Sequence, residues 1–312
     1  MTTFMKNFFG AKRQITLVSE SRLRPPTPSS SLFACSAGPD DLAITVWADD
    51  EFPDQWIVTR QWAEIVQETR VPSQLWRTVL VQPMPGGDVL LATARSSTDR
   101  EFLNARIYSP SGELKIAAHI GDGIAHLQTT TRGEVWVGYF DEGVFGDLGR
   151  NGRGTKPIAA SGLVRFNSRL EPVWEFEVDR EKFPDGRAAS EEQIADLYAL
   201  NVTDDRVLAL SYTSWTLLDI RDRDIDYVRT NASGCQHVLA HKNSFAFIGN
   251  YKQRDEVTFG SIVDDEFVPQ TRNSLPTPSA QGSDGMWATQ IGRGSTLHVF
   301  YEGIWSKHRL EP

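Results

Sequence analysis

The chain has 312 residues, of which 40% are hydrophobic and 23% are charged, and this composition is typical of a globular protein with a buried core. The formal net charge of −9 disfavours nucleic acid and anionic membranes as partners, and no stretch approaches the ~20 apolar residues of a membrane helix or the apolar core of a signal peptide. The only two cysteines, Cys35 and Cys235, exclude a disulfide framework and favour a cytoplasmic location.

Short runs rich in β-branched and aromatic residues recur along the chain and predict strands. After a first run at 13–19, they lie at 42–47, 89–94, 135–140, 207–212, 245–250 and 297–302. The starts of these last six are 38 to 52 residues apart, except for one interval of 72 that contains a Gly-rich insertion after Phe140. Each of the six follows a turn and another strand and precedes a hairpin, which indicates a repeat of four antiparallel strands.

Radial repetition of such units is typical of a β-propeller. We therefore predict one all-β domain over residues 1–312, a six-bladed β-propeller. The last repeat is one strand short, so residues 13–19 are expected to complete it and close the ring, which removes exposed sheet edges. A seven-bladed propeller and a two-layer sandwich are the alternatives. Residues 191–200 predict at most a short helical turn before an inner strand.

The long connections predict a functional face. In a propeller, the loops between second and third strands share a face with the links that lead to the next blade, and the other turns lie on the opposite face. The long connections 95–104, 141–161, 179–193, 251–256 and 271–284 all belong to the first group. Long loops on a rigid scaffold commonly carry function, so we expect loops 141–161 and 179–193 to bind a ligand or partner.

Acidic residues are expected to ring the channel mouth on that face. Asp122, Asp196 and Glu302 begin first strands or end second strands, and Ca²⁺ or Mg²⁺ prefers several such oxygen ligands. A divalent metal is therefore the cofactor to consider, with Asp141 and His237 as candidate catalytic groups. The alternative is a solvated acidic surface that holds no cofactor.

A basic, Gly-rich segment at 149–156 (GRNGRGTK) is the candidate anion site. Its backbone amides could hold an anion that Arg150 and Arg153 neutralise, with Glu142 nearby, although the order GTK does not match a phosphate-binding P-loop. Trp215 lies near a loop end and could line a pocket, and Tyr251 ends a second strand near the channel mouth, so both are candidate ligand-binding residues. We therefore expect the partner to be a protein or a small anionic ligand.

The repeated strand-turn-strand units resemble the superfamily of six-bladed β-propellers that includes NHL-repeat proteins and senescence-marker/gluconolactonase-like metal hydrolases. The segment GDGIAHLQTTTRGEVWVGYFDEGVFG is also similar to bacterial propeller proteins of unassigned function. The lactonase branch implies a divalent metal in the channel, held by Glu, Asn and Asp from different blades. Asp122, Asp196 and Glu302 could take those roles, but the N-terminal Glu-Gly-Pro-x-Trp stretch of that branch is missing from this sequence.

Two functions of different classes follow from these patterns. The first is a binding module that uses its long-loop face and needs no chemistry. The second is a metal-dependent hydrolase or lactonase, in which a metal at the channel mouth acts as Lewis acid and Asp141 or His237 moves a proton. We favour the binding module, because the sequence alone assembles no acid–base pair.

Overall fold

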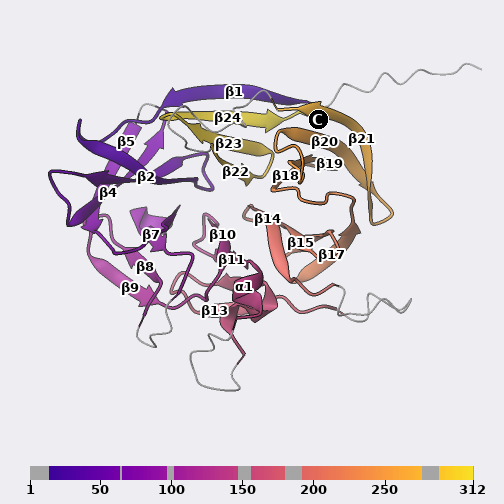
Figure 1. The fold of residues 1–312 in the computed structure, drawn as a ribbon, viewed down its shortest axis with the longest axis horizontal. Helices are drawn as coiled ribbons and strands as arrows, with labels where there is room; N and C mark the ends of the chain where they lie inside the picture. The colour runs from indigo at the N-terminus through magenta and orange to yellow at the C-terminus, as the bar shows by residue number, and fades with distance from the viewer. Residues whose placement is uncertain are drawn as a thin grey trace, which may run out of the picture.

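The computed structural model describes residues 14–63, 65–96, 102–146, 156–179, 192–275 and 288–311. Within them the chain is all-β, and its sheets are arranged around a common centre as in a propeller (Figure 1). Strands that follow one another in the chain pair antiparallel in groups of four, apart from β1, which joins the last group, so the repeat of four strands predicted from the sequence is confirmed.

The strands divide into four sheets of four strands and one of eight. The first sheet contains β2 (Ser30–Ala37), β3 (Ala43–Asp49), β4 (Gln55–Trp62) and β5 (Ile65–Pro72). The second contains β6 (Leu80–Pro83), β7 (Val89–Ala92), β8 (Ala105–Tyr108) and β9 (Leu114–Ala118). The third contains β10 (Ile124–Thr129), β11 (Val135–Tyr139), β12 (Leu163–Phe166) and β13 (Pro172–Glu175).

The eight-stranded sheet follows in the chain. It consists of β14 (Asp196–Val202), β15 (Val207–Tyr212), β16 (Thr216–Arg221), β17 (Asp224–Arg229), β18 (His237–His241), β19 (Ser244–Ile248), β20 (Glu256–Val263) and β21 (Glu266–Ser274). Its two halves, β14–β17 and β18–β21, are joined by one parallel residue pair, Arg229 with Glu266. We call the strand that comes first in each group of four, in chain order and leaving out β1, its first strand. These first strands contact one another around a closed ring in the order β2, β6, β10, β14, β18, β22 and back to β2.

The last sheet joins the two ends of the chain. It contains β22 (Thr289–Arg293), β23 (Thr296–Tyr301), β24 (Ile304–Leu310) and, as its outer strand, β1 (Ile15–Arg22). The pairing of β1 with β24 is antiparallel and runs from Ile15 opposite Leu310 to Arg22 opposite Ile304. The prediction that an N-terminal strand completes the final unit is therefore confirmed.

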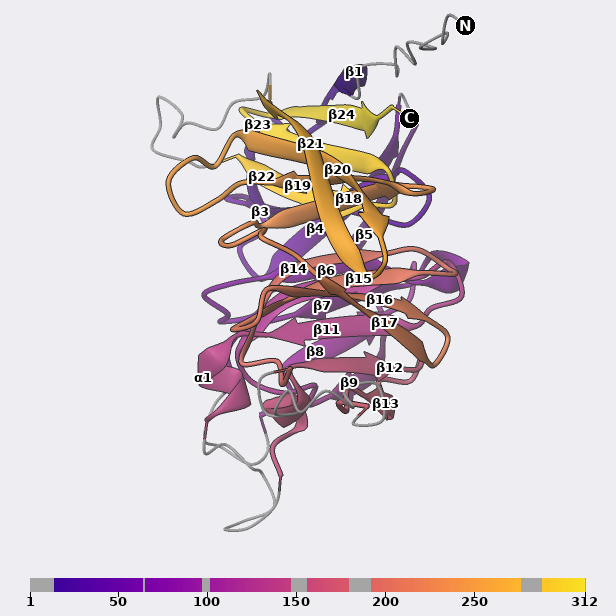
Figure 2. The same ribbon diagram turned by 90° about the vertical axis from the view of Figure 1, so that its right-hand side faces the viewer.

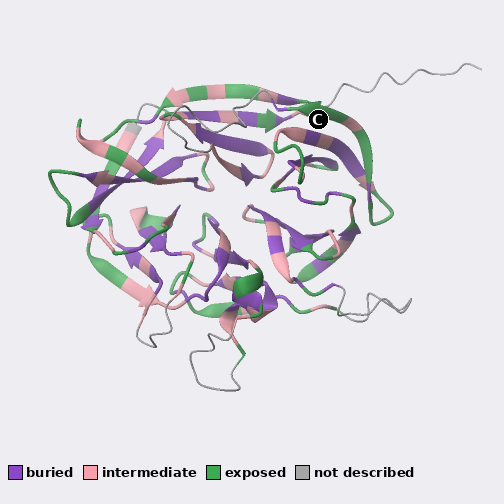
Figure 3. Ribbon diagram, viewed as in Figure 1, coloured by how far each residue is buried: buried purple, intermediate pink, exposed green. Residues whose placement is uncertain are grey.

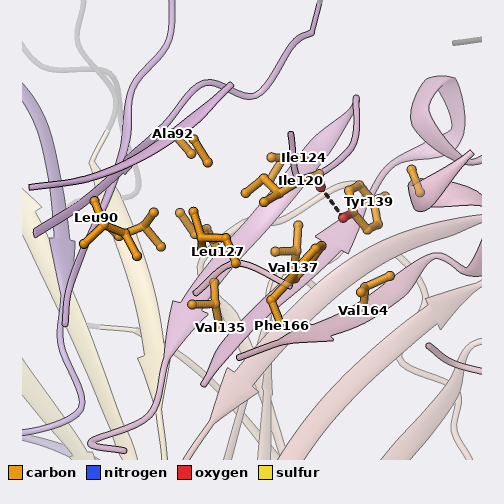
Figure 4. Close-up of a cluster of buried hydrophobic side chains, with 14 of the residues drawn as sticks. Leu90, Ala92, Ile120, Ile124, Leu127, Val135, Val137, Tyr139, Val164 and Phe166 are labelled. Carbon is orange, nitrogen blue, oxygen red and sulfur yellow. Dashed lines mark hydrogen bonds between the residues drawn. The ribbon is translucent and has the colours of Figure 1, made fainter. Parts of the chain in front are cut away.

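The hydrophobic core lies between neighbouring sheets. Second strands such as β7, β11 and β19 are buried at every position, because both faces of each strand are covered (Figure 3). Figure 4 shows the cluster in which Leu90 and Ala92 of β7 meet Leu127 and Val137 of the third sheet. The Tyr139 hydroxyl in this cluster donates a hydrogen bond to the carbonyl of Ile120, which satisfies the polar atom of a buried ring.

Helical structure is scarce and lies elsewhere than expected. Residues 192–200 contain no helix, because β14 already begins at Asp196. The described residues instead hold α1 (Asp141–Val144) and the 3₁₀ turns η1 (Pro85–Gly87) and η2 (Ile158–Ser161). The spacing of apolar residues at 194, 197, 198 and 200 therefore came from a strand with a register shift between Leu197 and Ala199.

Connection lengths define two faces. Turns between first and second or third and fourth strands are two to five residues long by the strand bounds. Every longer connection joins a second to a third strand, or one sheet to the next, which confirms that the long connections share a face. We name it the long-loop face and the opposite one the turn face. Helix α1 lies on the long-loop face, at the side of the stacked strands (Figure 2).

Candidate functional site

The centre of the molecule is filled at the turn face by one arginine. Arg293, at the end of β22, is buried and donates through Nη1 to the carbonyls of Thr129 (2.7 Å) and Val202 (3.2 Å). Its Nη2 donates to Oε1 of Gln82 (2.6 Å), and its Nε donates to the carbonyl of Ala37 (3.3 Å). These partners lie at or next to the ends of the first strands of four sheets, so Arg293 ties those strand ends together at the turn face.

Four aromatic rings form a cluster on the long-loop face of the eight-stranded sheet. Tyr198 lies on β14, Tyr212 ends β15, Trp215 lies in the following turn, and Tyr251 follows β19. The ring centroids are 4.8 Å apart for Tyr198 and Trp215, 5.4 Å for Tyr212 and Trp215, and 5.8 Å for Trp215 and Tyr251. These separations and their edge-to-face angles are favourable for aromatic pairs. We call these four residues the aromatic cluster.

The aromatic cluster is fixed internally and open to solvent at its edge. The hydroxyls of Tyr198 and Tyr251 share a hydrogen bond of 3.0 Å, which together with burial raises the pKa of Tyr198. Tyr251 is 64% exposed and Tyr212 is 37% exposed. Large exposed aromatic rings that are already held in place lose little conformational entropy on binding, so this arrangement suits ligand contact.

Carboxylates adjoin the aromatic cluster. Asp196 lies two residues before Tyr198, and burial together with the charge of Asp141 raises the pKa of Asp196 to about 6. The structure thus brings the predicted residues Asp141 and Asp196 near each other, from α1 and β14. The negative charges of Asp141 and Asp196 beside the aromatic cluster attract cations.

Replacing Asp196 by asparagine is expected to raise the free energy of unfolding by about 1 kcal/mol at pH 8 and to change it little at pH 4.5. The folded state disfavours the charged carboxyl, so the wild type loses stability as the pH rises from about 4 through about 6. Asparagine resembles the neutral acid and removes that loss. Urea unfolding at both pH values measures it, with the exposed Asp50→Asn as control; equal effects of the two variants would contradict this assignment.

Arg95 links two other predicted residues. Its Nε lies 3.3 Å from Oδ1 of Asp122, and its Nη1 pairs with Oε2 of Glu142. Asp122 is only 6% exposed and also accepts a hydrogen bond of 2.5 Å from the backbone amide of Ser96. A Cβ at Gly143 would lie 2.1 Å from the carbonyl of Asp122, so α1 packs closely on the residues before β10. These contacts fix the position of α1, which carries Asp141, relative to the start of β10.

The other predicted catalytic and metal residues lie apart from this bridge. His237 begins β18, where burial and the neighbouring His126 lower its pKa to about 3, so it is neutral at pH 7. Glu302 is exposed in the short turn between β23 and β24. Among the described residues, no group of three or more His, Cys, Asp or Glu side chains is placed to hold a metal ion. Arg150 and Arg153 lie outside the described residues.

Two members of the aromatic cluster were missed by the sequence interpretation. The missed members are Tyr198 and Tyr212. Trp215 was expected near a pocket and Tyr251 at the channel mouth, and the structure brings both together with the two missed residues. Tyr212 ends a second strand, so the rule that placed Tyr251 at the channel mouth also applied to it. Arg293 had no local signal, because its partners come from distant parts of the chain.

No protein-family model matches the sequence, and no curated protein matches it either. Among solved structures, a chain of the mitotic checkpoint complex is 9% identical, with a TM-score of 0.49 over 100% of this chain and 97% of that one. The Cps50 (Swd1) beta-propeller domain of Myceliophteria thermophila is 8% identical, with a TM-score of 0.48 over 96% and 100%. A catalytically inactive virginiamycin B lyase from Staphylococcus aureus, solved with quinupristin, is 11% identical, with a TM-score of 0.47 over 94% and 99%.

Within the described part of the chain, no helix has the length and apolar character needed to cross a membrane.

Proposed function

We propose that this protein is a six-bladed β-propeller that binds a ligand or partner protein through its long-loop face. The observation that carries the proposal is the aromatic cluster, a set of pre-ordered rings that remain exposed beside Asp196 and Asp141. Binding needs only such a surface and no catalytic group.

The blade count rests on the eight-stranded sheet being two blades. Its halves meet through the single pair of Arg229 and Glu266, whereas consecutive strands within each half pair over many residues. The closed sequence of contacts among β2, β6, β10, β14, β18 and β22 supports the same count. Leu208 and Leu210 of the first half share a core cluster with Phe245 and Phe247 of the second half. The two halves therefore pack on each other as neighbouring units do elsewhere in the molecule.

The chemistry beside the aromatic cluster favours a cationic group in the ligand. An arginine side chain can stack on an exposed tyrosine and be attracted by Asp196 and Asp141. A protein segment that carries arginine would combine stacking on the tyrosine with attraction to the two carboxylates, so we propose such a segment as the ligand. A small anionic ligand stays the alternative, since it would depend on Arg150 and Arg153.

Replacing Tyr251 by alanine is expected to weaken binding of a capped Arg-Gly-Arg peptide at least fivefold, since a stacked cation contributes about 1 kcal/mol at an exposed ring. Calorimetric titration in low-salt buffer measures this, with a capped Glu-Gly-Glu peptide as the opposite charge. Phe52→Ala is the matched control, because Phe52 is another exposed ring, in the connection between β3 and β4. If neither peptide gave binding that depends on Tyr251, the aromatic cluster would not be the binding site.

A hydrolase is the second candidate, and the raised pKa of Asp196 favours it. A carboxyl that titrates near pH 6 is suited to general acid–base work. A metal-dependent form of this candidate would instead need Ca²⁺ or Mg²⁺ on Asp122, Asp196 and Glu302, which the described residues do not bring together as one ligand set, and the metal would polarise a lactone or ester carbonyl. A rise in melting temperature of chelator-treated protein on adding either ion would favour it over the binding module.

A further inference from the structure

A second site lies on the turn face, away from the aromatic cluster. A pocket of about 380 Å³ opens there between the first-to-second-strand turns of the first three sheets and the β4–β5 hairpin. Its apolar wall consists of Pro39, Leu42, Trp62, Pro83, Met84 and Pro85. The volume is within the range of small-molecule sites, which are usually apolar with few polar groups.

The one arginine of this pocket is buried and has no carboxylate partner among the described residues. Arg60 is 6% exposed, and its Nη2 donates to the carbonyls of Gly87 and Asp88. Its Nε makes no hydrogen bond within the described parts of the chain. The carboxylate of Asp88 pairs instead with Lys115. Burial lowers the pKa of Arg60, and the charge of Asp88 opposes this shift only in part.

A buried cation that no carboxylate contacts directly is costly, and a ligand anion in the adjoining pocket would offset the part of that cost that Asp88 leaves uncompensated. We propose that this pocket binds a carboxylate carried on an apolar body, with Arg60 facing the carboxylate and the wall of Trp62, Leu42 and Met84 enclosing the body. An apolar wall strengthens the attraction, because the effective dielectric constant is lower than in water.

The pocket also carries a feature that selects for low charge. Asp40, an exposed residue, lines it together with Arg60. A second negative charge on the ligand would be repelled by Asp40, so a monocarboxylate is favoured over a phosphate or a dicarboxylate.

The strand register supplies a substitution that tests the site without removing Arg60. Gln67 of β5 is exposed, lines the pocket and stands directly opposite Arg60 of β4. Residues directly opposite in antiparallel strands have side chains on the same side of the sheet. Gln67→Glu therefore places a permanent carboxylate beside the guanidinium, where it competes with the ligand. Gln55→Glu makes the same charge change at an exposed position at the far end of this hairpin.

Titration calorimetry of the full chain with 3-phenylpropanoate tests the proposal. We expect binding by the wild type and by Gln55→Glu, at least tenfold weaker binding by Gln67→Glu, and about twofold to fivefold tighter binding by Asp40→Asn. The neutral 3-phenylpropionamide should bind at least tenfold more weakly than the acid. A capped tripeptide ending in a free Phe carboxylate distinguishes a peptide terminus from a free acid as the natural source.

Several results would overturn the site. Equal affinity for acid and amide would remove the role of Arg60, and unchanged affinity of Gln67→Glu would place binding elsewhere. Failure of both 3-phenylpropanoate and the peptide to bind would also reject the proposal. The Gln55→Glu and Asp40→Asn variants change exposed positions only, so a folding defect in Gln67→Glu would still leave the Asp40→Asn comparison decisive.

Discussion

Replacing Arg293 by methionine is expected to lower the free energy of unfolding by about 3 to 5 kcal/mol. The substitution keeps an unbranched apolar stem but removes every donor of the Arg293 guanidinium. Four buried acceptors, on Ala37, Gln82, Thr129 and Val202, then lose the guanidinium, and within the described ranges only Gln82 Oε1 keeps other donors, the amide and hydroxyl of Thr129. An unpaired buried acceptor costs about 1 to 3 kcal/mol, and the desolvation of the charge, which methionine avoids, recovers part of that sum.

Arg293→Lys separates charge from geometry. Lysine keeps the positive charge but has no planar fork, so it cannot donate in the directions of all four acceptors. We expect it to recover less than half of the lost stability. If lysine restored full stability, charge rather than the directed hydrogen bonds would hold the strand ends together.

Urea unfolding followed by circular dichroism and by tryptophan fluorescence measures both variants. Agreement of the two probes would justify a single free energy for this multi-sheet protein. Arg229→Met is the matched control, because Arg229 is an exposed arginine whose one ion pair within the described segments, to Glu266, spans 4.0 Å. Its effect should stay within about 0.5 kcal/mol. A comparably small effect of Arg293→Met would show that the buried hydrogen bonds of Arg293 are not needed for stability.

Most of the fold could be predicted because its signal is local. A second strand is covered on both faces, so runs such as VLLATA and VWVGYF are apolar throughout, and their repetition revealed the units. Turn residues between the runs set the strand boundaries. Residues 192–200 were wrongly predicted to contain a helical turn, because a register shift in β14 gives their apolar residues a helical spacing. Only the pairing of β14 with β15 shows that this segment is a strand.

The candidate site could be predicted only in part, because it depends on contacts across strands. The position rule for propeller faces found Trp215, Tyr251 and Asp196, which the structure places together or close by. It could not show that Asp122 is bound by Arg95, since that depends on where α1 packs. Arg60 likewise gave no signal, because its guanidinium is held by the carbonyls of Gly87 and Asp88 in the neighbouring sheet, far from it in sequence.

Deletion of residues 1–22 is expected to lower the free energy of unfolding by on the order of 5 kcal/mol and to cause self-association. The deletion removes β1, whose pairs with β24 extend from Ile15 to Arg22. It also exposes the core side chain of Leu310, which packs in one cluster with Ile15. The larger consequence is a free edge on β24, whose unpaired backbone groups would recruit a strand from a second chain.

Deletion of residues 1–13 is the matched control, since it leaves β1 complete. Size-exclusion chromatography and thermal unfolding of both deletions should separate a closing strand from a dispensable terminus. Adding a synthetic peptide of residues 14–23 to the longer deletion should restore the monomer, because the vacated edge selects the register that Ile15 and Leu310 define. If the longer deletion remained monomeric and as stable as the control, closure by β1 would not hold the ring, and the packing between sheets together with Arg293 would have to do so alone.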